Sequence, residues 1–153
     1  CHREENTRDA ETLVGILDAM EELDAPVVYP VHPRNKRTVL ELLDRGFRNV
    51  LAVEPVGYLE SVWLTCNARQ VVTDSGGLQR EAFFAGVKCV TVLDFEVWPE
   101  TMVSNRNLLA HADKSSILAA MSESQSIDSS YQPFGDGRAS SYIVDALLTQ
   151  LGD

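Results

Sequence analysis

The chain has 153 residues, 44% of them hydrophobic, and a formal net charge of −10. This composition is typical of one compact domain that buries its own core, and the acidic excess argues against broad affinity for nucleic acid, whose phosphates are bound mainly by lysine and arginine clusters. No apolar run approaches the about eighteen residues that a membrane helix needs, and residues 1–9 lack the features of a signal peptide, so we expect a cytoplasmic protein without membrane contact.

Apolar runs alternate with amphipathic stretches along the chain. Runs of branched apolar residues predict strands at residues 27–31, 50–53, 70–73 and 88–93. Helical spacing predicts helices at residues 9–23, 35–45, 58–67, 77–85, 101–105, 115–121 and 138–151, and residues 122–137 read as a polar loop. Repeated strand–helix units of this length predict an α/β fold, in which helices cover both faces of a parallel sheet.

The cysteines Cys1, Cys66 and Cys89 are far apart and form no C-x-x-C pair. This pattern indicates neither a zinc site nor a disulfide framework. We therefore expect three reduced thiols and no bound metal.

The segment TDSGGLQREAFFAG, residues 73–86, joins a predicted strand to a predicted helix. In doubly wound sheets, ligands bind beyond the carboxyl ends of the strands. Gly76 and Gly77 leave the first amides of the helix open to an anion, Ser75 adds a hydroxyl donor, and Glu81 is placed to accept from ribose hydroxyls. The alternative is a capped helix, with Asp74 or Ser75 as the N-cap and the residues at 79 and 80 merely exposed.

The same segment resembles the T-D-S-G-G-x-Q-x-E-A signature of the non-hydrolysing UDP-N-acetylglucosamine 2-epimerases. Four further motifs resemble those of the family and follow in the family's order. They are His2-Arg3-Glu4-Glu5-Asn6, Pro30-Val31-His32-Pro33, Glu54-Pro55-Val56-Gly57-Tyr58-Leu59 and Phe134-Gly135-Asp136-Gly137-Arg138-Ala139. Together the five motifs cover nearly the whole chain.

The resemblance implies a three-layer, Rossmann-like domain spanning residues 1–153, which forms the C-terminal half of a glycosyltransferase type-B fold. The family's enzymes are isomerases of nucleotide-sugar metabolism for cell-surface polysaccharides. They eliminate UDP to a 2-acetamidoglucal and add it back with C2 inverted, without metal or redox cofactor. The N-terminal domain, which supplies the carboxylates that move the C2 proton, is absent from this chain, so we expect the isolated chain to be inactive and the full-length protein to be a homodimer.

The resemblance also assigns roles to individual residues. It places the diphosphate at Ser75, Gly76 and Gly77, the ribose at Glu81, and the catalytic imidazole at His2, although His2 could equally be a frayed terminus. The uracil would lie against the loop that contains Val53, Pro55 and Tyr58, where Tyr58 could instead be a core-facing residue at a helix start. Further candidates for the sugar cleft are His32, Arg34 and Glu100, against the alternatives of a structural histidine at 32 and a helix N-terminal acid at 100.

One stretch departs from the family pattern. Leu93 stands where many members have an arginine, and Glu96-Val97-Trp98 stands where they have T-E-R. The tryptophan resembles the branch that acts on UDP-2,3-diacetamido sugars. Loss of an arginine near a diphosphate removes a bidentate partner, so we expect another cation, Arg106 or Arg138, to replace it, or a different substrate.

Two other functions stay open at the level of sequence. The chain could be the donor-binding half of a UDP-sugar glycosyltransferase, although that function does not account for the H-R-x-E-N element at its start. It could also be a UDP-binding domain without catalytic activity.

Overall fold

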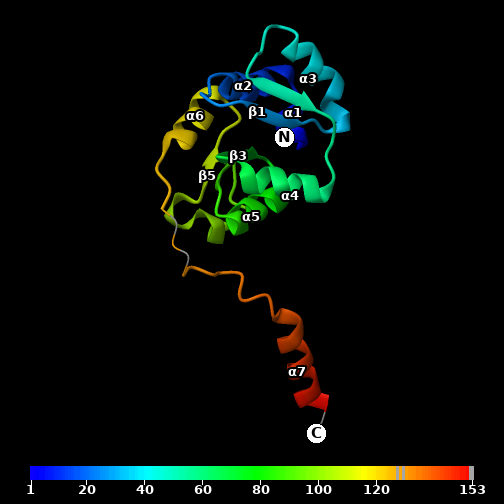
Figure 1. The fold of residues 1–153 in the computed structure, drawn as a ribbon, viewed down its shortest axis with the longest axis vertical. Helices are drawn as coiled ribbons and strands as arrows, with labels where there is room; N and C mark the ends of the chain where they lie inside the picture. The colour runs from blue at the N-terminus through cyan, green and yellow to red at the C-terminus, as the bar shows by residue number, and fades with distance from the viewer. Residues whose placement is uncertain (127, 129, 152–153) are drawn as a thin grey trace.

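The computed structural model describes residues 1–126, 128 and 130–151 (Figure 1). Its strands are β1 (Val27–Pro30), β2 (Val50–Val53), β3 (Gln70–Thr73), β4 (Lys88–Val92) and β5 (Asn107–Ala110). Its helices are α1 (Glu4–Thr7), α2 (Ala10–Glu21), α3 (Lys36–Leu43), α4 (Tyr58–Asn67), α5 (Gly76–Ala85), α6 (Lys114–Ser122) and α7 (Ala139–Leu151). Two 3₁₀ segments are η1 (Pro33–Asn35) and η2 (Pro99–Asn105).

The strands pair in parallel, as the alternation of strands and helices predicts, but they form two sheets instead of one. β1 pairs with β2, while β4 lies between β3 and β5. The carboxyl ends of β1 and β3 meet at the first residues of the chain, because the Tyr29 hydroxyl donates to the Cys1 carbonyl at 3.2 Å and Asp74 accepts from the His2 amide at 2.8 Å. The α/β class is confirmed, and these residues connect the two sheets.

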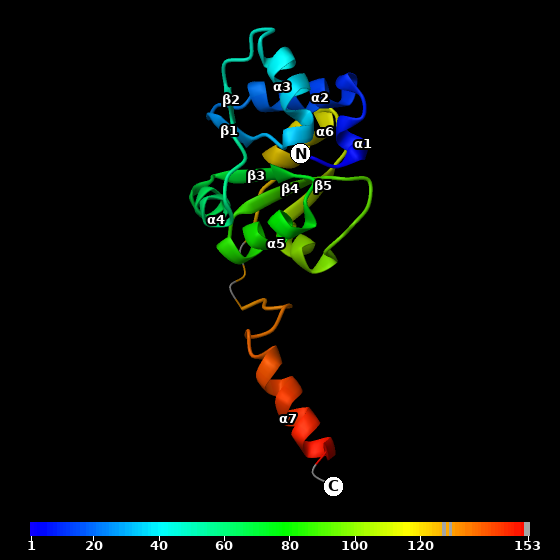
Figure 2. The same ribbon diagram turned by 90° about the vertical axis from the view of Figure 1, so that its right-hand side faces the viewer.

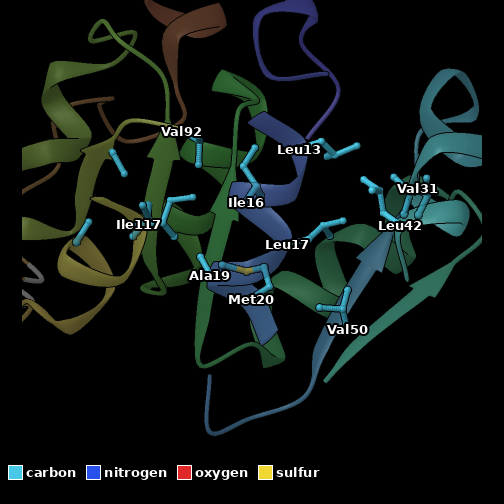
Figure 3. Packing of buried hydrophobic residues seen from close by; sticks show 14 residues of the cluster. Leu13, Ile16, Leu17, Ala19, Met20, Val31, Leu42, Val50, Val92 and Ile117 are labelled. Carbon is cyan, nitrogen blue, oxygen red and sulfur yellow. The ribbon is translucent and has the colours of Figure 1, made fainter. Parts of the chain in front are cut away.

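Helices cover both faces of the sheets, which gives three layers (Figure 2). One face packs against α2, whose buried residues recur at helical spacing as Leu13, Ile16, Leu17 and Met20. Figure 3 shows that this helix lies against Val50 of β2 and Val92 of β4, so α2 spans both sheets. α3 and α6 join the same core, and a second cluster formed by Val71, Ala82, Val87 and Cys89 lies on the α5 side.

Several boundaries differ from the predicted ones. β5 and the short helix α1 were not predicted, and residues 101–105 belong to a 3₁₀ segment that begins at Pro99. α7 extends away from the rest of the chain in both views, and none of its residues is buried (Figures 1 and 2). No helix within residues 1–126, 128 and 130–151 is long and apolar enough to cross a membrane.

Candidate functional site

The turn between β3 and α5 presents two open amides and a hydroxyl. Ser75 caps the helix, because its Oγ accepts from the Leu78 amide at 3.4 Å. Gly76 and Gly77 are the first two residues of this ten-residue helix, and amides at those positions have no acceptor within the helix. Since the Ser75 oxygen acts as an acceptor, its proton remains available for donation to a ligand. The capped-helix alternative and the anion-binding role are therefore compatible.

The two glycines have different surroundings. A Cβ on Gly76 would lie 3.0 Å from Val97 Cγ1 and 3.1 Å from Trp98 Nε1, so the loop after β4 fills that side. A Cβ on Gly77 would meet only Ser75 Oγ, at 3.6 Å. The sequence suggested that both glycines make room for a ligand, but at Gly76 the space is taken by the protein itself. Gly77 is exposed and keeps the turn open.

Glu81 lies just over one turn along α5 and is half-buried. Across the residues that the structure describes, its carboxylate makes no hydrogen bond or ion pair. A half-buried carboxylate without a protein partner can accept from a ligand's hydroxyl groups. Its position beside the open turn fits the predicted ribose contact.

Asp74, the last residue before the turn's serine, holds the amino-terminal motif in place. It is fully buried, and its Oδ2 accepts from the backbone amides of His2 and Arg3, each at 2.8 Å. Its Oδ1 lies 3.1 Å from His2 Nδ1, and its carbonyl accepts from Arg3 Nε at 2.8 Å. Asn6 adds a bond at 3.3 Å from Nδ2 to Oδ2. Sequence reasoning considered Asp74 only as a possible helix cap and missed this role.

The contacts of Asp74 determine its ionisation. Burial acts to raise the pKa of its carboxyl group, but the Arg3 and His2 amides and the nearby His2 imidazole act to lower it, and the pKa is lowered. Asp74 is therefore a buried anion whose Oδ2 accepts from donors at the start of the chain, while its Oδ1 lies close to the His2 imidazole without a hydrogen bond.

The predicted histidines come together at this edge. The rings of His2 and His32 stack with centroids 5.7 Å apart and planes inclined by 23°. His32 is also the N-cap of η1, where its Nδ1 accepts from the Arg34 amide at 3.3 Å. His2 is thus not a frayed residue, and His32 has a structural role as a cap in addition to any contact with a ligand. The side chain of Arg34 is exposed and makes no hydrogen bond or ion pair with another described side chain.

Of the three residues predicted to contact uracil, only Val53, the last residue of β2, lines a cavity. Val53 lines an apolar cavity of about 450 Å³ with Val28, Val56, Leu59, Glu60, Trp63 and Leu64. Pro55 is exposed, and Tyr58 is 70% exposed at the start of α4, so it is not a core-facing residue. Pro55 and Tyr58 lie outside the lining of that cavity.

The loop from β4 to η2 is anchored to α5. The Trp98 carbonyl accepts from the Thr101 amide at 2.9 Å and from Thr101 Oγ1 at 2.7 Å, while Gln79 Nε2 donates to Thr101 Oγ1 at 2.7 Å. Gln79 is 1% exposed, contrary to its placement at the surface in the capped-helix alternative. Glu100 is half-buried, and its Oε2 is a buried oxygen without a hydrogen-bond partner among the described residues.

Neither arginine expected to replace the family's cation is at the glycine turn. Arg106 is buried at the other end of α5, where its Nη2 donates to the Phe83 carbonyl at 3.1 Å and its guanidinium lies 4.1 Å from the Phe83 ring. Arg138 contacts Tyr142 of α7, at 5.6 Å from the ring centroid. Neither arginine therefore replaces the family's cation at the turn, because both contact aromatic rings elsewhere, and the alternative of a different substrate stays a prediction.

The cysteines and the other metal-binding side chains are dispersed. All three thiols are free, and burial raises the pKa of the Cys89 thiol to about 12. Throughout residues 1–126, 128 and 130–151, no group of three or more His, Cys, Asp or Glu side chains is arranged to hold a metal ion.

The chain is similar in sequence to known proteins. The sequence pattern of the UDP-N-acetylglucosamine 2-epimerase family matches residues 1–148. A UDP-2,3-diacetamido-2,3-dideoxy-D-glucuronate 2-epimerase of Pseudomonas aeruginosa is 42% identical over 151 residues, which are 95% of this chain and 42% of that protein. A UDP-N-acetylglucosamine 2-epimerase homolog of Methanococcus maripaludis is 37% identical over the same shares of the two chains.

The fold is also similar to those of solved epimerase structures. The Methanocaldococcus jannaschii UDP-N-acetylglucosamine 2-epimerase in complex with UDP-N-acetylglucosamine and UDP superposes with a TM-score of 0.79 at 33% identity, covering 97% of this chain and 43% of that one. The Neisseria meningitidis enzyme bound to UDP-N-acetylglucosamine gives a TM-score of 0.78 at 26% identity over the same shares of both chains. The chain thus spans about two fifths of the relatives that it matches. It belongs to the UDP-N-acetylglucosamine 2-epimerase family.

Proposed function

We propose that residues 1–153 form the UDP-binding domain of an enzyme that inverts C2 of a UDP-N-acetylhexosamine. The observation that carries the proposal is the open turn at Ser75–Gly77, with the unpartnered carboxylate of Glu81 along the same helix. An anion at the turn would gain hydrogen bonds and the favourable end of the helix dipole. Diphosphate and ribose are adjacent in UDP, and the turn and Glu81 offer contacts to each in that order.

The proposed reaction is an elimination followed by an addition. A base removes the C2 proton while the bond from C1 to the UDP oxygen breaks, which leaves a 2-acetamidoglucal; UDP then returns to C1 and a proton to the opposite face of C2. His2, oriented by Asp74 at 3.1 Å, is the residue of this chain that we assign to the developing negative charge on the leaving phosphate. The carboxylates that move the C2 proton are assigned to the N-terminal domain.

The proposal also assigns residues to the uracil and the sugar, and an oligomeric state to the full-length enzyme. Val53 and its cavity are the proposed contact for uracil, with Pro55 and Tyr58 as further proposed contacts outside the cavity lining. His32, Arg34 and Glu100 are proposed for the sugar side of the cleft. The Pseudomonas aeruginosa relative and Trp98 favour a diacetamido sugar over N-acetylglucosamine itself. We further propose that the full-length enzyme is a cytoplasmic homodimer, as the family resemblance implies.

For the 153-residue chain alone we propose UDP binding without turnover. Its relatives are more than twice as long, and the half that it matches does not include the proposed proton-transfer carboxylates. The alternative of a UDP-binding domain without catalytic activity thus applies to the isolated chain, and not to the full-length enzyme.

Calorimetry with UDP, UMP, ADP and UDP-sugars tests the proposal. We expect weak binding that prefers UDP to ADP, and Glu81→Ala should reduce the binding free energy by about 1.5–3 kcal/mol, the usual range for a charge-assisted hydrogen bond. Asp145→Ala is the matched control, because it removes one carboxylate from exposed α7. Equal affinities for ADP and UDP, or equal losses in the two variants, would contradict the proposal.

A further inference from the structure

Arg80 and Trp98 form a stacked pair beside the open turn. The Arg80 guanidinium carbon lies 4.3 Å from the centroid of the Trp98 ring, a distance that gives a favourable cation–π interaction. Arg80 is exposed, and no carboxylate within the described ranges of the chain forms an ion pair with it. Its N–H donors therefore remain available, while the stacking limits the positions of its long side chain.

Trp98 is itself held in place. Its carbonyl accepts two bonds from Thr101, and its ring meets the edge of Phe134 with centroids 6.1 Å apart. Its indole nitrogen lies 3.1 Å from the point where a Cβ of Gly76 would be. The indole N–H makes no hydrogen bond to a described residue, so a donor without a protein partner lies beside Gly76 at the start of α5.

We propose that Arg80 and Trp98 bind the diphosphate of the UDP-sugar and replace the arginines that this chain lacks. The inference rests on the proposed function and extends its site. Trp98 Nε1–H donates to a non-bridging phosphate oxygen beside the amides of Gly76 and Gly77. Arg80, positioned by the indole ring, supplies the positive charge.

The negative charge near the turn would repel a diphosphate unless a cation lay close by. The chain has 23 acidic and 13 basic residues, and Glu81 follows Arg80 directly in α5. A carboxylate next to a diphosphate is repulsive unless a cation lies between them or beside them. Leu93, where many relatives carry an arginine, is 6% exposed and uncharged. Arg3 also reaches this loop, over the Phe95 ring at 5.8 Å, but its Nε donates to the Asp74 carbonyl. The Arg80 guanidinium makes no hydrogen bond to a described residue, and Arg106 and Arg138 contact aromatic rings elsewhere.

Titration of UDP and of uridine into paired variants tests the inference. Arg80→Gln should weaken UDP binding by about tenfold or more and leave uridine binding unchanged, because uridine has no phosphate. Trp98→Phe keeps an aromatic ring for Arg80 but removes the N–H, so we expect a smaller loss, about threefold, again confined to UDP. The dependence of UDP affinity on salt should be shallower in Arg80→Gln than in the parent chain.

Arg138→Gln is the matched control, because Arg138 also stacks on an aromatic ring but lies next to α7. It should bind UDP as the parent chain does. If Arg80→Gln and Arg138→Gln bind UDP equally well, or if Arg80→Gln weakens UDP and uridine alike, the inference is overturned while the proposed function stands. If the parent chain binds no UDP, the proposed function fails and this inference fails with it.

Discussion

Asp74 connects the parts of the candidate site at the level of single residues. It joins the end of β3 to residues 2–6, more than 65 positions away in the chain. Its Oδ2 accepts from the amides of His2 and Arg3 and from Asn6 Nδ2, and such hydrogen bonds favour the ionised form of a buried carboxylate. His2 is therefore positioned by the side chain that precedes the proposed phosphate-binding turn, so Asp74 positions both the proposed catalytic imidazole and the turn.

We predict that Asp74→Asn destabilises the chain by about 1.5–3 kcal/mol, because two amides lose a charged acceptor. The pKa of Asp74 is lower in the folded chain than its ordinary value of 3.8, so its ionisation stabilises the fold above that pH and the contribution is lost as pH falls through the folded-state pKa. Urea denaturation between pH 7 and pH 3 measures both effects. The variant should lose part of the acid dependence, whereas Asp145→Asn should match the parent; an unchanged acid dependence in Asp74→Asn would refute the assignment.

The sequence singled out candidate site residues but not their contacts. The motifs selected His2, Ser75 and Glu81, and the structure brings the segment of His2 to the turn that contains Ser75. The pairing of His2 with Asp74 spans 72 positions, and no periodicity in a single sequence reports such a contact. The predicted place of Arg106 near the diphosphate was wrong for the same reason, since its stacking on Phe83 is a tertiary contact.

At the scale of elements, local composition predicted the strands that are rich in branched residues. β1 to β4 agree with the predicted runs within one residue. β5 was missed because its residues, Asn-Leu-Leu-Ala, include no β-branched side chain and two types that favour helices. The division into two sheets was also not predicted, since strand pairing depends on contacts between distant segments. α2 compensates for that division by covering both sheets with one apolar face.

The start of α5 offers a paired test of its two glycines. Gly76→Ala should destabilise the chain by about 1–3 kcal/mol, because a Cβ there would crowd Val97 and Trp98. Gly77→Ala has room and a helical backbone, so the fold should be as stable as the parent or more stable by up to about 1 kcal/mol. If Gly77 serves ligand approach, its alanine variant should nevertheless bind UDP more weakly.

Thermal melting and calorimetry on the same samples separate stability from binding. A Gly77→Ala variant with full UDP affinity would show that the open side of the turn is not used by the diphosphate. A Gly76→Ala variant as stable as the parent would show that the loop at residues 97–98 moves to accommodate the added Cβ without loss of stability.

At the scale of the whole chain, α7 stands apart. It exposes a series of apolar side chains: Tyr142, Ile143, Val144, Leu147, Leu148 and Leu151. Neither of the two buried clusters includes a residue of α7. A helix of this length that is not packed against a core is marginally stable in water.

We therefore predict that truncation after Gly137 leaves the melting temperature of the remaining chain within about 2 °C of the parent, because a change below about 0.5 kcal/mol moves the midpoint of a domain of this size by no more than that. Far-ultraviolet circular dichroism, followed during heating, measures the midpoint and the loss of helix signal together. A large fall in the midpoint would mean that α7 packs on the domain in solution.

The projection of α7 also affects how the chain moves through solution. A body with a protruding arm meets more friction than a sphere of the same 16.9 kDa, so it diffuses more slowly and leaves a sizing column early. An early peak is therefore expected even for a monomer of this chain, and elution volume alone does not distinguish an elongated monomer from a dimer.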